Sequence, residues 1–280
     1  YRAGFPDVDI EDEVVLTDSG ESTKTVRLEF HIKPGQKTIT GDIRYKNMET
    51  VAEARLNQQL TFEPGAPFNP QAVDQSLNKL RSLRIFDELQ AEPVEASEGK
   101  RDVVFSGQLK PANKVSLLFG AGSYDVLRAG IEWEQTNLWG RAHQGRLFAI
   151  QSFKASRVEY TYNIPQIGGW NLEFYGITDF LQREEISFER NELSTRFGLQ
   201  HMWTEYSLLT AMQYNFQRLE ADLSNNFDRS AGRRKAIVSS LEFKVGRNKL
   251  DNPLTPQSGY RLNSVLELAS PGLGGEVDYQ

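Results

Sequence analysis

The second half of this chain alternates apolar and polar residues with a period of two, and this pattern most constrains the fold. In residues 127–134 the apolar side chains share one face of an extended strand: Leu127, Ala129, Ile131 and Trp133. The opposite face carries charge at Arg128, Glu132 and Glu134. A strand with this alternation presents one face to an apolar medium and the other to water. Several charges on one inward face do not suit the core of a soluble sandwich, whereas they suit a membrane barrel with a wet lumen.

The composition excludes several other classes of protein. Only 39% of the 280 residues are hydrophobic, the mean hydropathy is −0.52, and no segment approaches the roughly 18 to 20 consecutive apolar residues of a spanning helix. Transmembrane strands escape a hydropathy criterion because half of their residues face the lumen. The net charge of −6 argues against nucleic acid as a partner, and the absence of cysteine excludes disulfides and cysteine-based metal sites. Many aromatic residues stand at the ends of the alternating segments, as in the aromatic girdle of a barrel.

From residue 114 onward the sequence predicts strands only, joined in an antiparallel meander. The nine expected strands cover residues 114–124, 126–136, 145–153, 157–164, 170–181, 192–203, 205–219, 235–247 and 259–269. A tenth strand is expected to begin near Gly275 and to continue through Val277–Gln280. Longer polar connections are expected at Glu184–Asn191 and Glu220–Arg234, and their alternation with short turns is typical of a membrane barrel.

Residues 37–111 have the pattern of a small α+β domain with the order strand, helix, helix, strand, strand. The expected elements are Thr38–Tyr45, Val51–Leu60, a helix from Pro70 to about Leu83, Glu88–Val94 and Asp102–Leu109. Asn69 precedes Pro70, which provides a good N-cap followed by a good first helical residue. We expect the three strands to form one sheet with both helices on one face.

The first 36 residues repeat the end of this domain. They predict two strands around a turn: Val8–Leu16, Asp18–Glu21 and Thr25–Ile32. Two pairs of segments align with one small gap: Gly4–Val8 with Arg84–Glu88, and Ile32–Pro34 with Leu109–Pro111. A repeat of this length indicates tandem domains, each with its own core. We therefore expect residues 1–36 to end one such domain, residues 37–111 to be a complete copy, and residues 112–280 to be the N-terminal portion of the barrel.

Four groups of motifs carry a family resemblance. They are Gly65–Phe68 with Leu83–Asp87, Gly120–Tyr124 with Asn137–Gly140 and His143, Tyr160–Pro165, and Asp251–Tyr260. The first group resembles a POTRA domain, the periplasmic module of outer-membrane insertases. The others resemble the opening strands, the fourth strand and the mid-barrel signature of the BamA/TamA-type outer-membrane protein assembly family. Trp133 and the Asn137–His143 turn favour the TamA-like branch of that family.

The resemblance implies POTRA domains in the periplasm followed by an antiparallel barrel of sixteen strands in the outer membrane of a Gram-negative bacterium. Such a protein inserts or translocates other proteins without a cofactor. The implied partners are unfolded outer-membrane or autotransporter clients, outer-membrane lipid and lipopolysaccharide, and a periplasmic or inner-membrane partner subunit. The chain begins at Tyr1 without a signal peptide and reaches only about the tenth strand, so we expect a portion of a longer exported protein.

The resemblance also implies that the first barrel strand borders a seam, where a client strand would pair with its free edge. The residues concerned are Lys114, Val115, Ser116, Leu117, Leu118, Phe119, Gly120, Ala121 and Gly122. Unpaired backbone groups are costly in lipid, so an exposed edge there would pair strongly with an incoming strand. Glycine weakens a strand interior, which suits an opening seam, although barrel curvature alone is an equally good reason for Gly120 and Gly122.

A second client-binding edge is expected in the α+β domain, by analogy with the family. It consists of Glu88, Leu89, Gln90, Ala91 and Glu92. The charges at Glu88, Glu92 and Glu95 would equally protect an edge strand against aggregation.

Two further groups of motif residues are expected to be structural rather than ligand-binding. They are Gly65, Pro67 and Phe68 in the α+β domain, and Asp251, Pro253, Pro256, Gly259 and Tyr260 in the barrel. In the first group we expect a turn, a rigid φ and a core plug. In the second, the prolines belong in a turn because they cannot donate to a strand ladder, Asp251 accepts turn N–H groups, and Gly259 allows a close approach.

The sequence contains no credible catalytic constellation, and we do not expect an enzyme. His31, His143 and His201 are scattered and have no partner pattern for a nucleophile or a metal. The basic run Arg233–Lys235 either touches lipopolysaccharide phosphates or simply flanks a strand. Three rivals to an assembly factor remain open: a two-partner-secretion pore of the same superfamily, a passive porin-like barrel and, least favoured, an enzyme housed in a barrel.

Overall fold

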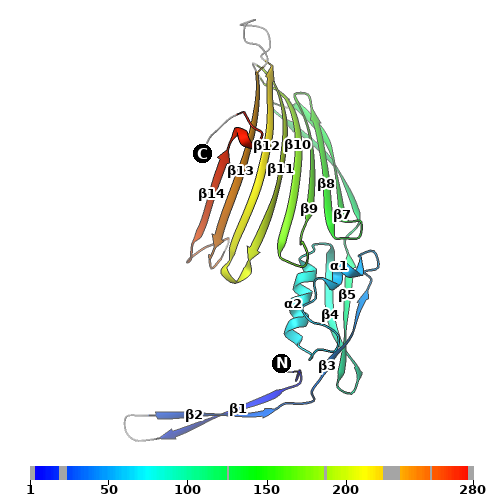
Figure 1. Ribbon diagram of the computed structural model, residues 1–280, viewed down its shortest axis with the longest axis vertical. Coiled ribbons are helices and arrows are strands. Elements are labelled where there is room, and N and C mark those ends of the chain that lie inside the picture. Colours follow the sequence, from blue (N-terminus) through cyan, green and yellow to red (C-terminus); the bar gives the residue numbers. More distant parts are fainter. Residues whose placement is uncertain are drawn as a thin grey trace. The chain divides into compact units, whose positions relative to one another are not determined.

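The structure, a computed structural model, describes residues 4–18, 24–124, 126–185, 188–222, 234–252 and 254–276 (Figure 1). The chain divides into two compact units, Tyr1–Leu109 and Lys110–Gln280. The first unit contains both α-helices, and the second is a sheet of antiparallel strands. In the described ranges, no helix is long and apolar enough to cross a membrane.

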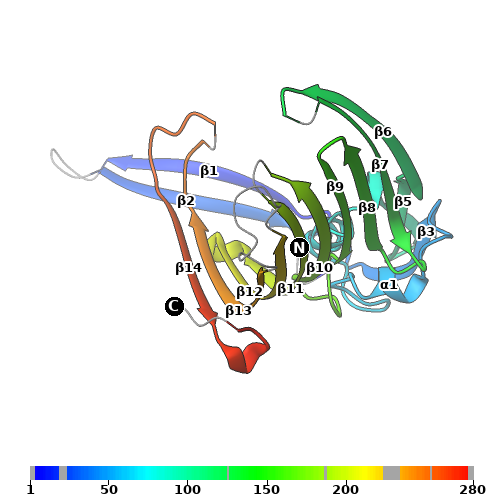
Figure 2. The same cartoon turned by 90° about the horizontal axis from the view of Figure 1, so that it is seen from above.

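The second unit is one nine-stranded sheet in the part of the chain that the structure describes. Its strands are β6 (Asn113–Gly122), β7 (Val126–Leu138), β8 (His143–Ser152), β9 (Ala155–Ile164), β10 (Leu172–Glu184), β11 (Glu189–Trp203), β12 (Leu208–Asp222), β13 (Arg234–Asn248) and β14 (Arg261–Ala269). Each strand pairs antiparallel with the next along the chain, so the order runs without a crossover from β6 to β14. The nine strands expected from alternation are confirmed, and Figure 2 shows them as a curved wall viewed from above.

Three expectations about this unit differ from the structure or lie outside it. The connection expected at Glu184–Asn191 was wrong in extent, because β10 continues to Glu184 and β11 begins at Glu189. The charged residues Glu184, Glu189 and Arg190 are therefore part of the paired strands and not of the connection between them. Most of Glu220–Arg234 lies outside the described residues. The segment up to Glu276 contains a short 3-10 helix, η2 (Pro271–Leu273), and no strand begins at Gly275, while residues 277–280 lie outside the described range.

The two faces of the nine-stranded sheet differ in chemistry, as alternation requires. The register aligns Val115 with Trp133 and Leu117 with Ile131, so the apolar positions of neighbouring strands share one face. Large apolar side chains on this face are strongly exposed: Leu117 67%, Phe119 79%, Leu127 58%, Phe180 44%, Phe197 46% and Leu266 55%. A soluble monomer rarely exposes so continuous an apolar surface, so this face is suited to lipid.

The first unit contains a three-stranded sheet with two helices. The elements are β3 (Ile39–Lys46), α1 (Glu53–Asn57), α2 (Pro70–Arg81), β4 (Phe86–Ser97) and β5 (Lys100–Leu109). The sheet order is β3-β5-β4, with β3 parallel and β4 antiparallel to the central β5. The expected strand-helix-helix-strand-strand order is therefore confirmed. Asn69 caps α2 by accepting a hydrogen bond from the Gln71 N–H, whereas α1 is only five residues long and is shorter than expected.

Apolar side chains from the helices and strands form the core of this unit. The largest fully buried ones are Met48, Leu56, Phe68, Leu80, Leu83, Ile85, Val103 and Phe105. A buried carboxylate joins the parallel strands: Asp102 on β5 accepts the Asp42 N–H at 2.8 Å and pairs with Arg44 at 2.7 Å. Gly41 makes room for it, because a Cβ there would lie 2.0 Å from Asp102 Oδ1.

A two-stranded hairpin precedes this sheet. It pairs β1 (Asp9–Asp18) with β2 (Lys24–Lys33), and the turn expected at Asp18–Glu21 lies largely outside the described residues. Ile10, Phe30 and Ile32 are 53%, 60% and 61% exposed. A lone two-stranded hairpin is at best marginally stable in water, and these exposed apolar side chains are available for packing.

We predict that Gly41→Ala destabilises the first unit by about 1–3 kcal/mol, because the added methyl overpacks the Asp102 carboxylate and displaces it from the Asp42 N–H. Hydrogen exchange of the β3 and β5 amides measures the effect. Asp42→Ala is the matched control, since it keeps the backbone donor and removes only a 4.0 Å contact between the exposed Asp42 and Lys100 side chains. Equal exchange rates in the two variants would contradict the prediction.

Candidate functional site

Strand β6 lies at one edge of the nine-stranded sheet and pairs only with β7 among the described strands. Side chains anchor it where it begins: Trp133 Nε1 donates to Asn113 Oδ1 at 3.1 Å, and Thr136 Oγ1 donates to the Pro111 carbonyl at 3.0 Å. Lys114 also forms a 3.6 Å ion pair with Glu134, and farther along β6 the backbone ladder and facing apolar side chains such as Leu117 and Ile131 hold the two strands together.

The residues expected to pair with clients all lie on this edge strand. Val115, Leu117 and Phe119 project from the lipid-compatible face, whereas Ser116 and Leu118 alternate on the other face. The two glycines differ in their surroundings. A Cβ at Gly120 would lie 2.7 Å from Arg128 Nε, and a Cβ at Gly122 would meet nothing within 4 Å. A side chain at position 120 would therefore have to displace the flexible Arg128 side chain, whereas a side chain at position 122 would meet open space.

The three-stranded sheet of the first unit also has an edge, on β4, that no other described strand pairs with. The expected edge residues Glu88, Gln90 and Glu92 are exposed, whereas Leu89 is buried against the helices. Pro93 occurs within β4, in keeping with an edge position because proline lacks the ladder donor. Arg81 of α2 donates to the Leu89 carbonyl at 3.0 Å, so one acceptor of this strand is already bonded.

The opposite edge of that sheet, on β3, is covered by the segment 65–68. The Thr40 N–H donates to the Ala66 carbonyl at 2.8 Å, and the Phe68 N–H donates to the Thr38 carbonyl at 2.9 Å. Gly65 has a φ of +85°, Pro67 bridges to Ile39, and Phe68 is 1% exposed. Sequence reasoning did not anticipate that this motif protects a strand edge, which leaves β4 as the free one.

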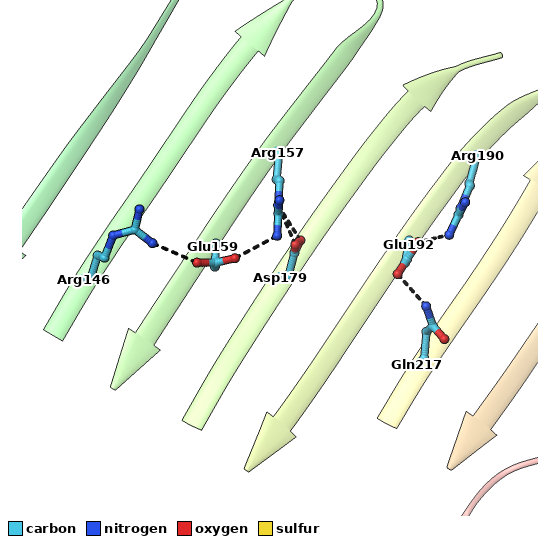
Figure 3. Close-up of polar contacts among 7 residues, drawn as sticks. All are labelled: Arg146, Arg157, Glu159, Asp179, Arg190, Glu192 and Gln217. Atoms are coloured by element: carbon cyan, nitrogen blue, oxygen red, sulfur yellow. Dashed lines mark hydrogen bonds and ion pairs between the residues drawn. The ribbon is translucent and has the colours of Figure 1, made fainter. Parts of the chain in front are cut away.

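An ion-pair network crosses the polar face of the nine-stranded sheet (Figure 3). Arg146 on β8 bonds Glu132 on β7 at 2.6 Å and Glu159 on β9 at 3.0 Å. Arg157 bonds Glu159 at 2.8 Å and Asp179 on β10 at 2.8 Å. The three carboxylates are only 10–17% exposed, so partial burial strengthens these charge-assisted contacts. The network connects four strands in the transverse direction.

A second polar cluster continues this face toward the other edge. Arg190 and Glu192 of β11 form an ion pair, and Gln217 of β12 donates to Glu192 (Figure 3). A hollow of about 510 Å³ lies on the same face, lined by residues that include Asp179, Glu192, Arg196, Gln213, Glu242 and Glu267. These charged and amide side chains can form hydrogen bonds with water, so the hollow is suited to a hydrated lumen. Sequence reasoning missed these pairings, although opposite charges at matching parity on successive strands are a signal for them.

Aromatic side chains gather where β7 ends and β8 begins. Trp139 lies 6.2 Å from His143 and from Tyr162 between ring centroids, and Tyr162 lies 6.5 Å from Phe174. His143 Nδ1 and Tyr162 Oη are 2.6 Å apart. Trp139 is 72% exposed, and an exposed aromatic cluster at one end of the sheet has the position of the aromatic girdle of a membrane barrel.

The connection between β13 and β14 is organised by Asp251. Its carboxylate accepts the N–H groups of Ser258 at 3.1 Å, Gln257 at 3.0 Å and Asn252 at 2.9 Å. These backbone donors, that of Ser258 first, hold the pKa of Asp251 below its ordinary value. Gly259 has a φ of +99°, and a Cβ there would lie 2.0 Å from the Lys249 carbonyl oxygen. Pro256 lies in this connection, and Pro253 lies outside the described residues.

Tyr260 ends this connection, with the Arg247 guanidinium 5.8 Å from its ring centroid. In the basic run, Lys235 pairs with Glu220 at 3.3 Å, while Arg233 lies outside the described range. The described residues contain no group of three or more histidine, aspartate or glutamate side chains that could hold a metal.

The two faces of the nine-stranded sheet, its aromatic girdle and its strand order together indicate the class of protein. A sheet with one lipid-compatible face and one ion-paired, water-compatible face is the wall of a transmembrane β-barrel. The Omp85 superfamily domain matches residues 137–280, just over half of the chain, and the chain belongs to this superfamily. It is an outer-membrane protein of a Gram-negative bacterium, with its POTRA-like region in the periplasm.

Among known proteins, the outer membrane protein assembly factor BamA of Neisseria meningitidis serogroup B is 25% identical over 281 residues. That match covers 89% of this chain and 34% of the relative, so the chain spans about a third of its length.

Two solved structures share the fold. BamA from Haemophilus ducreyi lacking POTRA domains 1–3 has a TM-score of 0.70 at 14% identity, covering 97% of this chain and 55% of that one. CdiB from Escherichia coli has a TM-score of 0.59 at 16% identity, and the match covers 100% of this chain and 52% of that one.

The expectation that the chain belongs to the TamA-like branch of the family stays a prediction.

We predict that Asp251→Ala loosens the connection 249–260, because three backbone donors lose their acceptor. The folded pKa is depressed, so the contribution of Asp251 is complete above the unfolded pKa of about 3.9 and is lost as the pH falls through the folded pKa. Hydrogen exchange of Gln257 and Ser258, corrected for intrinsic rates, should be faster in the variant at neutral pH. The difference should shrink at acidic pH. Gln257→Ala, which keeps the backbone donor, is the control and should behave as the wild type.

We predict that Arg157→Gln lowers the free energy of unfolding of the barrel by about 1–3 kcal/mol, because Asp179 loses its cation and Glu159 keeps only Arg146. The heat-induced mobility shift of the full-length protein in detergent gels measures this stability. The matched control is Arg218→Gln, since its partner Glu220 keeps Lys235. An equal shift in both variants would show that Arg157 adds no more stability than the contact of Arg218 with Glu220.

Proposed function

We propose that this protein is an outer-membrane assembly factor that inserts or translocates client proteins by pairing their strands with its own free edges. The whole protein would act without a cofactor and without catalysis. Its partners would be unfolded outer-membrane or autotransporter proteins, outer-membrane lipid and lipopolysaccharide, and a periplasmic or inner-membrane subunit.

The observation that carries this proposal is the state of β6. Among the described strands it lies at an edge of the sheet, and its hydrogen bond from Trp133 and its ion pair with Glu134 are both at its beginning, at Asn113 and Lys114. In lipid each unpaired backbone group costs several kcal/mol, so the free side of such a strand favours pairing with another strand. Resemblance to a BamA assembly factor supports the same assignment.

The free edge of β4 supports a second contact with clients. An extended segment that adds to a sheet edge gains main-chain hydrogen bonds irrespective of its sequence. Because the segment 65–68 covers β3, the acidic strand β4 is the side of this sheet open to such a segment. We also propose that residues 37–111 are a complete POTRA domain, that residues 112–280 are the N-terminal portion of the barrel, and that residues 1–36 end a preceding POTRA domain. The exposure of Ile10, Phe30 and Ile32 supports the last assignment.

A secretion pore of the same superfamily is the second candidate. Its support is the polar, ion-paired face with a hollow of about 510 Å³, which is compatible with passage through a lumen. A passive barrel would have less use for a POTRA-like unit with a free strand edge.

Site-specific crosslinking of the full-length protein in membranes tests the proposal. A photoreactive residue at Ser116 should crosslink to the C-terminal strands of several different outer-membrane proteins during their assembly. The same probe at Glu132, directly opposite on the internal strand β7, is the matched control and should give no client crosslinks. Crosslinks from Ser116 only to the protein's own last strand would reject the insertase and favour the pore or a passive barrel.

A further inference from the structure

An apolar groove lies on the lipid-compatible face beside the edge strand. Ala129 of β7 forms its floor, directly between Phe119 of β6 and Gln151 of β8 in the register. Leu127 and Phe153 complete the walls, and the hollow has a volume of about 680 Å³. Phe119 and Phe153 are 79% and 73% exposed, so two aromatic rings flank a small residue without covering it.

A polar hollow of about 200 Å³ adjoins the groove and shares Gln151 and Phe153 with it. Its lining contains amides, a hydroxyl, carboxylates and two cations, among them Ser156, Gln182, Glu189, Lys154 and Arg183. It therefore offers both hydrogen-bond donors and acceptors.

The two cations are arranged around one aromatic ring. Lys154 Nζ lies 5.3 Å and the Arg183 guanidinium 5.1 Å from the ring centroid of Tyr124, whose hydroxyl donates to the Glu184 carbonyl. Lys154 also pairs with Glu184 at 3.8 Å, and Arg183 pairs with Glu185 at 3.2 Å. These contacts join the ends of three hairpins and hold both cations in the lining of the polar hollow.

The hollows lie at the end of the sheet that faces the cell exterior. The chain passes from the periplasmic unit into the beginning of β6, so the ends of β6, β8 and β10 lie on the opposite side of the membrane. A ligand there would belong to the outer leaflet. Its acyl chain would bury apolar surface against Phe119 and Phe153, and its headgroup would meet donors, acceptors and cations.

We infer that the two hollows form one binding site for a phosphorylated, acylated sugar lipid of the outer leaflet. Sugar hydroxyls suit the amides and carboxylates of the polar hollow, and a phosphate would compete with Glu184 and Glu185 for Lys154 and Arg183. A plain phospholipid would fill the groove but would leave most of the polar partners unused. The inference rests on the lipid partner named in the proposed function but not on client insertion, and it places an ordered lipid against Phe119 on β6.

The test uses the full-length protein in vesicles of phosphatidylethanolamine and phosphatidylglycerol that contain a minor fraction of lipid A. After mild detergent extraction, native mass spectrometry measures the retained lipids. The wild type should retain lipid A in preference to phosphatidylglycerol. Ala129→Phe fills the groove and should lower lipid A retention about tenfold, which corresponds to about 1.4 kcal/mol. The double variant Lys154→Gln/Arg183→Gln should lose the preference for lipid A over phosphatidylglycerol.

Ala149→Phe is the matched control, because Ala149 lies on the same face, on β8 opposite Ile131, and lines neither hollow. It should retain lipid A as the wild type does, and the heat-induced mobility shift checks that each variant is folded. Equal retention of both lipids by the wild type, or unchanged lipid A retention in Ala129→Phe, would mean ordinary annular lipid and would overturn the inference.

Discussion

The rest of this structure depends on one constraint, the need of every backbone N–H and C=O group in lipid for a hydrogen-bond partner. A membrane offers no water to replace a missing strand, so each strand of the wall must pair on both sides or expose costly groups. The uninterrupted order from β6 to β14 meets this need for the interior strands. Among the described strands the pairing stops at both β6 and β14, and in our proposal the same constraint makes the edge of β6 a surface for client strands.

The two units meet this need for backbone hydrogen bonds in different surroundings, the first in water and the second in lipid. In the first unit water can solvate a free edge, and the structure covers β3 with the segment 65–68 while leaving β4 open and acidic. In the second unit the polar face is stabilised across the strands by Arg146 and Arg157, which connect carboxylates on β7, β9 and β10. The ion-paired strands β7 to β10 thus lie next to β6, whose central part lacks such side-chain contacts.

Much of the fold could be predicted from the sequence because its signals are local. Period-two alternation located all nine strands, and Asn69 before Pro70 located the start of α2. The errors also have local causes. The charges of Glu184 to Asn191 indicate a loop when taken alone, yet the backbone pairing of β10 with β11 continues to Glu184 and Glu189. The helix α1 covers only Glu53–Asn57, and the role of residues 65–68 in covering β3 is a tertiary one that helical spacing does not reveal.

The candidate site was predictable in part for the same reason. That β6 and β4 are edge strands follows from their order in the chain and from the family resemblance, and the turn-forming role expected for Asp251 matches its three backbone hydrogen bonds. The ion-pair network, the cover over β3 and the groove over Ala129 could not be predicted, because each depends on which residues of neighbouring strands stand opposite one another. By itself the sequence determined two faces of opposite polarity, nine strands and an α+β unit, since these depend on residues within a few positions of one another. Register and tertiary packing alone decided which charges meet and which edges stay open, because a shift of one residue between strands would exchange every partner.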